Sequence, residues 1–226
     1  MSGASADRVG ILGGTLDPIH VGHLETARAA QRALGLTRLV VMPSRIPPHR
    51  SEGPSASVFH RFAMAALAIA DIPDASVSDA ELEADGPSYT VSTLERLTAS
   101  GLDRSQLFFI TGADAFTEIE TWHRYPEVLD RAHFVVVSRP GTPAAVIPAR
   151  VPALVGRFRQ PGRVEPIGGA PAIFLLDAPT PDVSSTAIRR RLRAGESISG
   201  MVTPLVEGHI RRHGLYVETT TADLLR

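Results

Sequence analysis

Short apolar runs alternate with helical segments along most of this 226-residue chain. The expected strands are residues 8–12, 38–42, 75–79, 107–111, 134–138 and 173–176, and the expected helices are 20–34, 58–70, 91–100, 185–194 and 204–213, with a shorter helical region between 111 and 134. Most of these strands are apolar throughout, which is typical of strands buried on both faces. The alternation predicts an α/β fold: a doubly wound parallel sheet with helices on both faces and a small helical part at the carboxyl end.

The length predicts one domain over residues 1–226. We see no internal repeat and no clear linker, although residues 140–171 are crowded with proline and glycine and hold no strong periodicity. The first six residues and the polar tail 218–226 are expected to be mobile. A hydrophobic fraction of 43% and a charged fraction of 21% are those of an ordinary globular protein.

The composition excludes several kinds of chemistry. There is no cysteine, so disulfides, thiolate nucleophiles and cysteine-based zinc sites are absent. All 23 basic residues are arginine, so neither a P-loop lysine nor a lysine Schiff base is available. A net charge of −1 offers no long-range attraction for nucleic acid or an anionic membrane. With no signal-peptide pattern and no apolar run of spanning length, we expect a cytoplasmic protein without nucleic-acid or membrane partners.

The expected first strand runs into an eleven-residue string, Gly-Gly-Thr-Leu-Asp-Pro-Ile-His-Val-Gly-His, at residues 13–23. Gly13 and Gly14 allow a sharp turn and a close approach of phosphate to the backbone. The helix that follows offers N–H groups and the positive end of its dipole to an anion. His20 and His23 share a helix face there, although such a pair can also be incidental or bind a metal. No matching third ligand lies nearby in sequence, which disfavours zinc.

A second string, Val-Ser-Ser-Thr-Ala-Ile-Arg, occupies residues 183–189. Serine and threonine at a helix start cap the helix and offer hydroxyls, and Arg189 projects one turn later toward the same end. Taken alone, this string could be an ordinary helix cap followed by an exposed arginine.

Together the two strings resemble the signatures of the nucleotidyltransferase superfamily, namely its His-x-Gly-His element and its Ser-Ser-Thr-x-x-Arg phosphate site. Leu16 stands where the most similar members have phenylalanine, a volume-conserving departure. Of the arginines at 189–193, only Arg189 matches the motif.

Segments between the two strings resemble one branch, the nicotinate mononucleotide adenylyltransferases. Gly-Ala-Asp at 112–114 followed by Trp-His at 122–123 is similar to that family's Gly-x-Asp and Trp-aromatic pattern, and Ser138-Arg139-Pro140-Gly141 matches another element. The Tyr-Thr-Val-Ser-Thr segment at 89–93 and the Pro-Pro-His-Arg segment at 47–50 also match, but Ser92 replaces the usual aspartate and Arg50 the usual lysine. The matches span residues 9 to about 216, nearly the whole chain.

The resemblance implies a Rossmann-like enzyme of NAD biosynthesis that transfers the adenylyl group of ATP to nicotinate mononucleotide, releasing pyrophosphate. The implied catalytic residues are His20, His23 and Arg189. The implied ATP-binding residues are Gly13, Gly14, Thr15, His20, His23, Asp114, Ser184, Ser185, Thr186, Ile188 and Arg189. The implied nicotinate mononucleotide-binding residues are Thr15, Asp17, Pro48, His49, Arg50, Tyr89, Thr90, Trp122, His123 and Arg139. Mg²⁺ is expected to bind mainly through ATP phosphates, with no dedicated protein metal site.

Two alternatives stay open. One is another nucleotidyltransferase, such as pantetheine-phosphate adenylyltransferase or a cytidylyltransferase, and the other is a non-catalytic nucleotide sensor on the same fold. A class I aminoacyl-tRNA synthetase fragment would need a lysine signature that this chain lacks. Association into a homo-oligomer is compatible with the sequence but not specified by it. The main interpretation requires the strings at 13–23 and 183–189 to converge on one triphosphate site.

Overall fold

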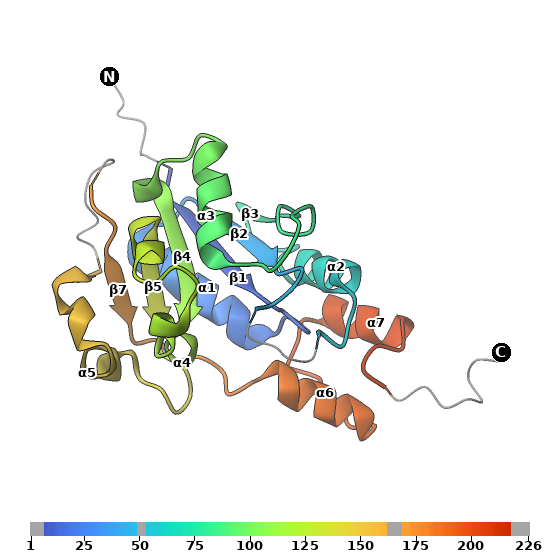
Figure 1. Cartoon of the computed structure of the whole chain (residues 1–226). Helices are drawn as coiled ribbons and strands as arrows, with labels where there is room; N and C mark the ends of the chain where they lie inside the picture. Colours follow the sequence, from blue (N-terminus) through green and yellow to red (C-terminus); the bar gives the residue numbers. More distant parts are fainter. Residues whose placement is uncertain (1–6, 49–52, 162–168, 218–226) are drawn as a thin grey trace.

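The computed structural model describes residues 7–48, 53–161 and 169–217. Its centre is a parallel seven-stranded sheet with the order β3-β2-β1-β4-β5-β7-β6 (Figure 1). The strands are β1 Val9–Gly14, β2 Arg38–Pro43, β3 Ala75–Val77, β4 Leu107–Gly112, β5 His133–Val137, β6 Phe158–Arg159 and β7 Ile173–Leu176. The doubly wound parallel sheet expected from the alternation is therefore confirmed.

Helices connect the strands and begin and end where local signals predict. The α-helices are α1 Val21–Leu34, α2 Val58–Ala68, α3 Thr90–Ala99, α4 Ala113–Phe116, α5 Ile147–Arg150, α6 Ser185–Arg193 and α7 Pro204–Arg212. Alanine-rich α1 ends at Gly35, whose φ of 59° lies in the left-handed region that glycine adopts without strain. Thr203 caps α7 by accepting a hydrogen bond from the Val206 N–H, and Pro204 stands at its first position.

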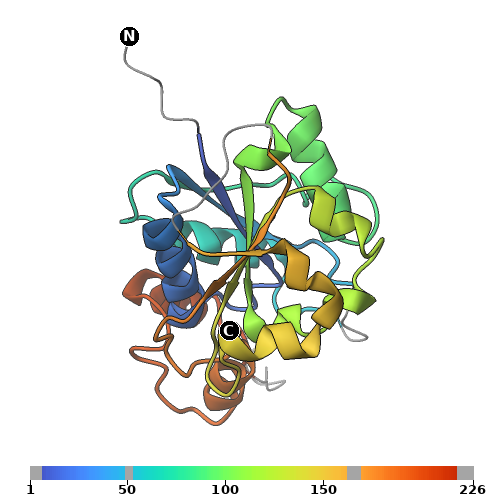
Figure 2. The same cartoon turned by 90° about the vertical axis from the view of Figure 1, so that its left-hand side faces the viewer.

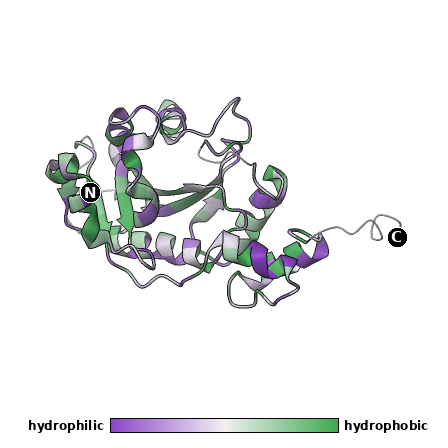
Figure 3. Ribbon diagram, turned by 60° about the horizontal axis from the view of Figure 1, so that its bottom comes forward, coloured by the Kyte–Doolittle hydropathy of each residue, from purple (hydrophilic) through white to green (hydrophobic). Residues whose placement is uncertain are grey.

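Side chains from successive strand residues enter two separate cores, one on each face of the sheet. In β5, Val135 and Val137 join the core under α1, α2 and α7, whereas Phe134 and Val136 join the core under α3, α4 and α5. Figure 2 shows the sheet between these two layers, and in Figure 3 its strands are mainly hydrophobic. Burial on both faces is the reason that these strands carry no alternating polar residues.

The strand order creates the place for a site. The chain moves from β1 outward through β2 to β3, then returns to the other side of β1 with β4 and continues outward through β5. The loops after β1 and β4 therefore leave the sheet in opposite directions, which opens a crevice at the carboxyl ends of these two strands. In Figure 1, α6 lies just beyond this end of the sheet.

One stretch has more regular structure than we expected from the sequence. Residues 140–171 contain α5, two 3-10 helices at Ala144–Val146 and Pro152–Arg157, and the edge strand β6. A strand of two residues and helices of one or two turns are too short to produce a periodic pattern, so only pairing with β7 defines β6.

His133, at the start of β5, makes the fold sensitive to acid. The side chain is fully buried, its Nδ1 accepts the Ala172 N–H at 2.9 Å, and its ring stacks on Phe108. Burial lowers the pKa of His133 to about 4, chiefly because the charged imidazolium cannot be hydrated there. The folded protein thus holds this imidazole neutral at a pH where the unfolded chain would bind a proton.

We therefore expect the free energy of unfolding to fall as the pH decreases from about 6.5 toward 4, with His133 contributing about 3 kcal/mol of that loss. His133→Asn keeps an acceptor for the Ala172 N–H but cannot be protonated, so its stability should depend less steeply on pH. Urea unfolding at a series of pH values measures both slopes. Equal slopes for the variant and the wild type would contradict the prediction.

Candidate active site

The two sequence strings meet at the carboxyl edge of the sheet. Ser185 donates its hydroxyl to the Pro18 carbonyl at 2.9 Å, and Arg189 Nη1 donates to the Asp17 carbonyl at 2.6 Å. Ser184 caps α6 by accepting the Ala187 N–H at 3.1 Å. The convergence that the main interpretation requires is therefore present, between residues more than 160 positions apart.

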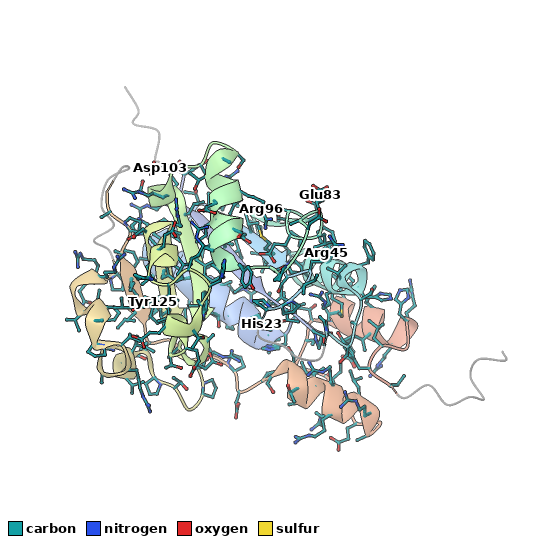
Figure 4. All side chains as sticks on the ribbon, in the orientation of Figure 1. His23, Arg45, Glu83, Arg96, Asp103 and Tyr125 are labelled. Carbon is teal, nitrogen blue, oxygen red and sulfur yellow. The ribbon has the colours of Figure 1, made fainter. Side chains whose placement is uncertain are left out.

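His20 and His23 stack on each other at the start of α1, with ring centroids 3.7 Å apart. His20 is the N-cap residue of α1, and its backbone N–H donates to His23 Nδ1 at 3.2 Å. Because Nδ1 accepts this bond, the proton of neutral His23 resides on Nε2, which becomes a donor. Figure 4 shows His23 near the centre of the view, at the end of the sheet that faces α6.

Both imidazoles are neutral at pH 7. Burial and, to a smaller extent, the positive charge of Arg139 together lower the pKa of His20 to about 3. Burial, then His20 and then Arg139 hold the pKa of His23 well below its usual value. An anion bound between these groups would oppose both effects, because it stabilises positive charge.

Arg139, which follows β5, lies beside the histidines. Its Nη2 donates to the Val183 carbonyl at 3.2 Å, while the buried Nη1 has no hydrogen-bond partner among the described residues. Gly22 makes this approach possible: a Cβ there would lie 2.8 Å from Arg139 Nη1 and 3.0 Å from the His20 ring. The sequence predicts Arg139 as a nicotinate mononucleotide-binding residue, and the structure places its guanidinium beside the histidine pair.

The start of α1 offers less to an anion than the sequence suggested. The Val21 N–H donates to the Met201 carbonyl, and the His23 N–H donates to the His20 carbonyl, both at 3.0 Å. Since these helix-start N–H groups already have acceptors, the imidazole and guanidinium side chains are the main donors at this end of the site.

A cavity of about 380 Å³ adjoins the turn after β1. Its walls include aromatic residues and the start of α3 and consist of Gly13, Gly14, Thr15, Ser44, Pro47, Pro48, Glu81, Ser88, Tyr89, Thr90, Phe109, Thr111, Ala115, Trp122, His123 and Val128. Trp122 packs edge-to-face on Phe109, and His123 stacks on Tyr89 with centroids 4.0 Å apart. An apolar, partly aromatic cavity of this size suits a small ring-bearing ligand.

Several residues that the sequence predicts for the site make contacts within the protein itself. The Ile188 side chain is fully buried in a core, and its N–H donates to the Ser184 carbonyl within α6. Asp114 is exposed, and its carboxylate lies against Gly112, in the space that a Cβ at that position would fill. Thr186 is also exposed, and its hydroxyl accepts a hydrogen bond from Arg189 Nη2 at 3.3 Å. His49 and Arg50 lie outside the described residues.

The side chain of Asp17 is fully buried, and the residue does not line the cavity. Its oxygens accept the backbone N–H groups of Ser55 at 2.8 Å and Ala56 at 3.1 Å, and the Tyr216 hydroxyl at 2.8 Å. Burial and the Asp17 charge raise the pKa of Tyr216 far above its ordinary value. Tyr216 therefore remains a neutral hydrogen-bond donor to Asp17.

Comparisons with known proteins agree with this arrangement. A family profile described as cytidylyltransferase-like matches residues 11–191. A Desulfatibacillum aliphaticivorans protein described as a probable nicotinate-nucleotide adenylyltransferase is 38% identical over 93% of this chain and all of its own length. A Chromohalobacter salexigens protein with the same description is 40% identical over 92% of this chain and 95% of its own. This chain belongs to the nicotinate-nucleotide adenylyltransferase family.

Solved structures support the fold of this family member. The Plasmodium falciparum nicotinic acid mononucleotide adenylyltransferase, in complexes with APC and with NaAD, superposes with TM-scores of 0.65 and 0.66. Each alignment covers 93% of this chain and 97% of the other at 17% identity. Among the described residues, no helix has the length and apolarity needed to cross a bilayer.

Three residues of this family member's site escaped the sequence analysis. Arg61 and Glu81 are buried beside the cavity, and Tyr216 reaches Asp17 from beyond α7. Glu81 accepts a hydrogen bond from the Thr93 hydroxyl at 2.5 Å in the first turn of α3, next to the serine that replaces the family's aspartate. Charged residues are mostly exposed in proteins, so a single one in a helix or loop is expected at the surface. No local pattern in the sequence therefore predicts the burial of Arg61 or Glu81.

The neutral histidines of this adenylyltransferase family member generate a prediction. The His20 Hε1 resonance should not titrate between pH 8 and 5, because burial keeps the pKa of His20 near 3. Arg139→Met should raise the pKa of His20 by removing a positive charge, yet leave it below 6.5 because burial is the larger cause. NMR titration, with His20→Asn to assign the signal, measures both values. A wild-type midpoint near 6.5 would refute this description of the site.

Proposed function

We propose that this protein transfers the adenylyl group of ATP to nicotinate mononucleotide, forming nicotinate adenine dinucleotide and pyrophosphate. The observation that carries the proposal is the meeting of the His-x-Gly-His turn with the cap of α6, next to a cavity with aromatic walls. The relatives described as nicotinate-nucleotide adenylyltransferases support the choice of substrates.

The reaction is an in-line displacement at phosphorus. A phosphate oxygen of nicotinate mononucleotide forms a bond to the α-phosphorus of ATP, and the bond from that phosphorus to the bridging oxygen breaks as pyrophosphate leaves. No group of the protein becomes covalently attached, so the chain contributes alignment of the two phosphates and stabilisation of developing negative charge.

The histidine pair and Arg139 act at the reacting phosphorus. Neutral His23 donates from Nε2, because its Nδ1 already accepts the His20 N–H. The buried Nη1 of Arg139 points toward the same place and has a donor to offer phosphate oxygen. A neutral imidazole can also gain a proton as negative charge accumulates, since nearby phosphate raises its pKa.

The start of α6 holds the leaving phosphates. Ser185 and Thr186 stand in its first turn, where N–H groups lack helical acceptors and the dipole favours anions. Arg189 is anchored to the Asp17 carbonyl through Nη1, and its guanidinium brings a positive charge to the start of α6, where it favours phosphate. This anchor also couples the position of Arg189 to the turn after β1.

The pyridine mononucleotide occupies the cavity. Trp122 and Tyr89 offer flat faces for the pyridine ring, and the start of α3 at Thr90 offers its N–H groups and dipole to the ring carboxylate. Thr15, at the junction between cavity and histidine turn, lies where the substrate phosphate would approach. Their positions in the cavity wall support roles in acceptor binding for Thr15, Tyr89, Thr90, Trp122 and His123.

Mg²⁺ is the expected cofactor, and the residues present fit an ion carried by the nucleotide. The described residues contain no group of three or more histidine, aspartate or glutamate side chains arranged to hold a metal. Mg²⁺ usually keeps several waters and binds through substrate phosphates, where it neutralises charge on the triphosphate. The chain's own part is then to orient that triphosphate through α6 and the histidine turn.

A substrate panel tests the proposal directly. Purified protein with ATP and Mg²⁺ is offered nicotinate mononucleotide, nicotinamide mononucleotide or phosphopantetheine. A parallel reaction replaces ATP by CTP and adds an acceptor of cytidylyltransferases. The nucleotide product and pyrophosphate are quantified in each. We expect rapid formation of nicotinate adenine dinucleotide and slower use of the amide. Turnover with phosphopantetheine alone would replace the proposal by the rival activity, and ATP binding without any product would identify a nucleotide sensor.

A glycine pair tests whether the histidine turn is the chemical centre. Gly22→Ala inserts a methyl group 2.8 Å from Arg139 Nη1, and we expect turnover to fall by about a hundredfold, as a misplacement of about 1 Å can cause. Gly208→Ala in α7 is the control, because a Cβ there meets nothing within 4 Å. The control should keep full turnover and gain up to about 1 kcal/mol of stability. Turnover of Gly22→Ala within about threefold of wild type would move the chemistry elsewhere.

A further inference from the structure

Arg61 is the single arginine among the buried side chains of the described chain, with 1% of its surface exposed. It lies in the first turns of α2, and its guanidinium points into the protein beneath the loops that surround the cavity. Burying a guanidinium is costly unless its donors find acceptors. The acceptors that surround the guanidinium therefore determine where the Arg61 side chain lies.

Its donors reach four backbone carbonyls. Nη1 donates to Thr15 at 2.7 Å and to Ser44 at 2.6 Å, Nη2 donates to Arg45 at 3.3 Å, and Nε donates to Ala56 at 3.3 Å. Thr15 belongs to the turn after β1, Ser44 and Arg45 follow β2, and Ala56 precedes the cap of α2. One planar group thus connects the turn after β1 with both ends of the loop between β2 and α2.

Two of these segments form neighbouring parts of the cavity wall. Thr15 lines the cavity beside the histidine turn, and Ser44 lines it in the loop that continues to Pro47 and Pro48. Arg61 itself is not among the lining residues, so any effect on a ligand passes through the carbonyls that it holds.

The contact chain continues to the aromatic side of the cavity. The Arg45 N–H donates to the Ser88 hydroxyl at 2.9 Å, and the Ser88 N–H donates to the Ile46 carbonyl at 2.8 Å. Ser88 immediately precedes Tyr89. The loop after β2 therefore transmits the position of Arg61 to the start of α3.

The far end of the same loop is held from both sides. The Ala56 carbonyl accepts from Arg61, while the Ala56 N–H donates to the buried carboxylate of Asp17 at 3.1 Å. Asp17 in turn accepts the Ser55 N–H at 2.8 Å. Arg61 and Asp17 together attach the end of this loop to the turn that carries the histidines.

We propose that Arg61 is a positioning residue for the pyridine mononucleotide: by holding the carbonyls of Thr15, Ser44 and Arg45, it sets the position of this part of the cavity wall. The inference rests on the proposed function for its substrate and on the observed contacts for its geometry. In the proposed function, ATP is bound mainly by α6 and the histidine turn, whereas nicotinate mononucleotide occupies the cavity. A change at Arg61 should therefore affect binding of nicotinate mononucleotide more than binding of ATP.

Lysine cannot replace this arginine. An ammonium group is a compact point donor, whereas the guanidinium sends donors in several directions within one plane. Arg61→Lys should retain the charge and one carbonyl contact while releasing others. Arg61→Gln removes the charge as well.

Steady-state kinetics of these two variants test the inference. We expect the KM for nicotinate mononucleotide to rise about tenfold or more, as loss of a charge-assisted hydrogen bond implies. The KM for ATP should stay within about threefold of wild type, so only the KM for nicotinate mononucleotide should change strongly. Arg8→Lys is the matched control, because Arg8 Nη1 also donates to a backbone carbonyl, that of Leu34 at 2.8 Å, but at the amino end of β1. It should leave both KM values unchanged.

A merely structural role predicts a different result. It would lower the urea midpoint and the active fraction of the Arg61 variants, while the folded enzyme kept its wild-type KM for both substrates. A KM for nicotinate mononucleotide equal to wild type in Arg61→Lys overturns the proposal. So does failure of both variants to fold, since Arg61 would then be required for the core as a whole.

Trp122 provides a readout that needs no substrate. It is the single tryptophan of the chain and lines the cavity, so acrylamide quenching of its fluorescence reports access to that wall. Quenching should increase in both Arg61 variants and not in Arg8→Lys. If the wild type formed no dinucleotide, the proposed function would fail, yet quenching would still decide whether Arg61 controls the cavity. Unchanged quenching in both variants counts against the inference.

Discussion

The buried carboxylate of Asp17 is the interaction on which the rest of the site depends. A carboxylate removed from water is stable only when donors surround it, and Asp17 collects them from Ser55, Ala56 and Tyr216. These partners lie 38, 39 and 199 positions away in sequence. Through its own carbonyl, the same residue also anchors Arg189. The loop after β2, the start of α6 and the carboxyl-terminal segment thereby share one attachment point.

The absence of lysine gives the structure a consistent chemical character. Arg61, Arg139 and Arg189 each donate to backbone carbonyls near the site. A guanidinium can bind a carbonyl with one nitrogen and still present another to a phosphate, which a single ammonium does with less directional control. Arginine therefore holds the loops in place and supplies positive charge at the same time.

The sequence predicted those parts of the site that are encoded in contiguous strings. The structure brings the histidine turn to the α6 cap and lines the cavity with Tyr89 and Trp122, all of which the motifs had singled out. Arg61 was missed because an isolated arginine in an apolar helix gives no local sign of burial. The position of Arg139 beside the histidines could not be read from the sequence, because it depends on close packing against Gly22 rather than on its neighbours in sequence.

By itself the sequence determined the alternation of buried strands and helices, the parallel sheet and the glycine turn, since each follows from local propensity and burial pattern. Only the tertiary structure decided which distant segments meet. It also decided the protonation state of the histidines in the site. Serine at 185 reaches the chain at Pro18, and burial beside Arg139 keeps His20 neutral. Contacts and solvation of this kind depend on the three-dimensional surroundings of a group, which no short stretch of sequence contains.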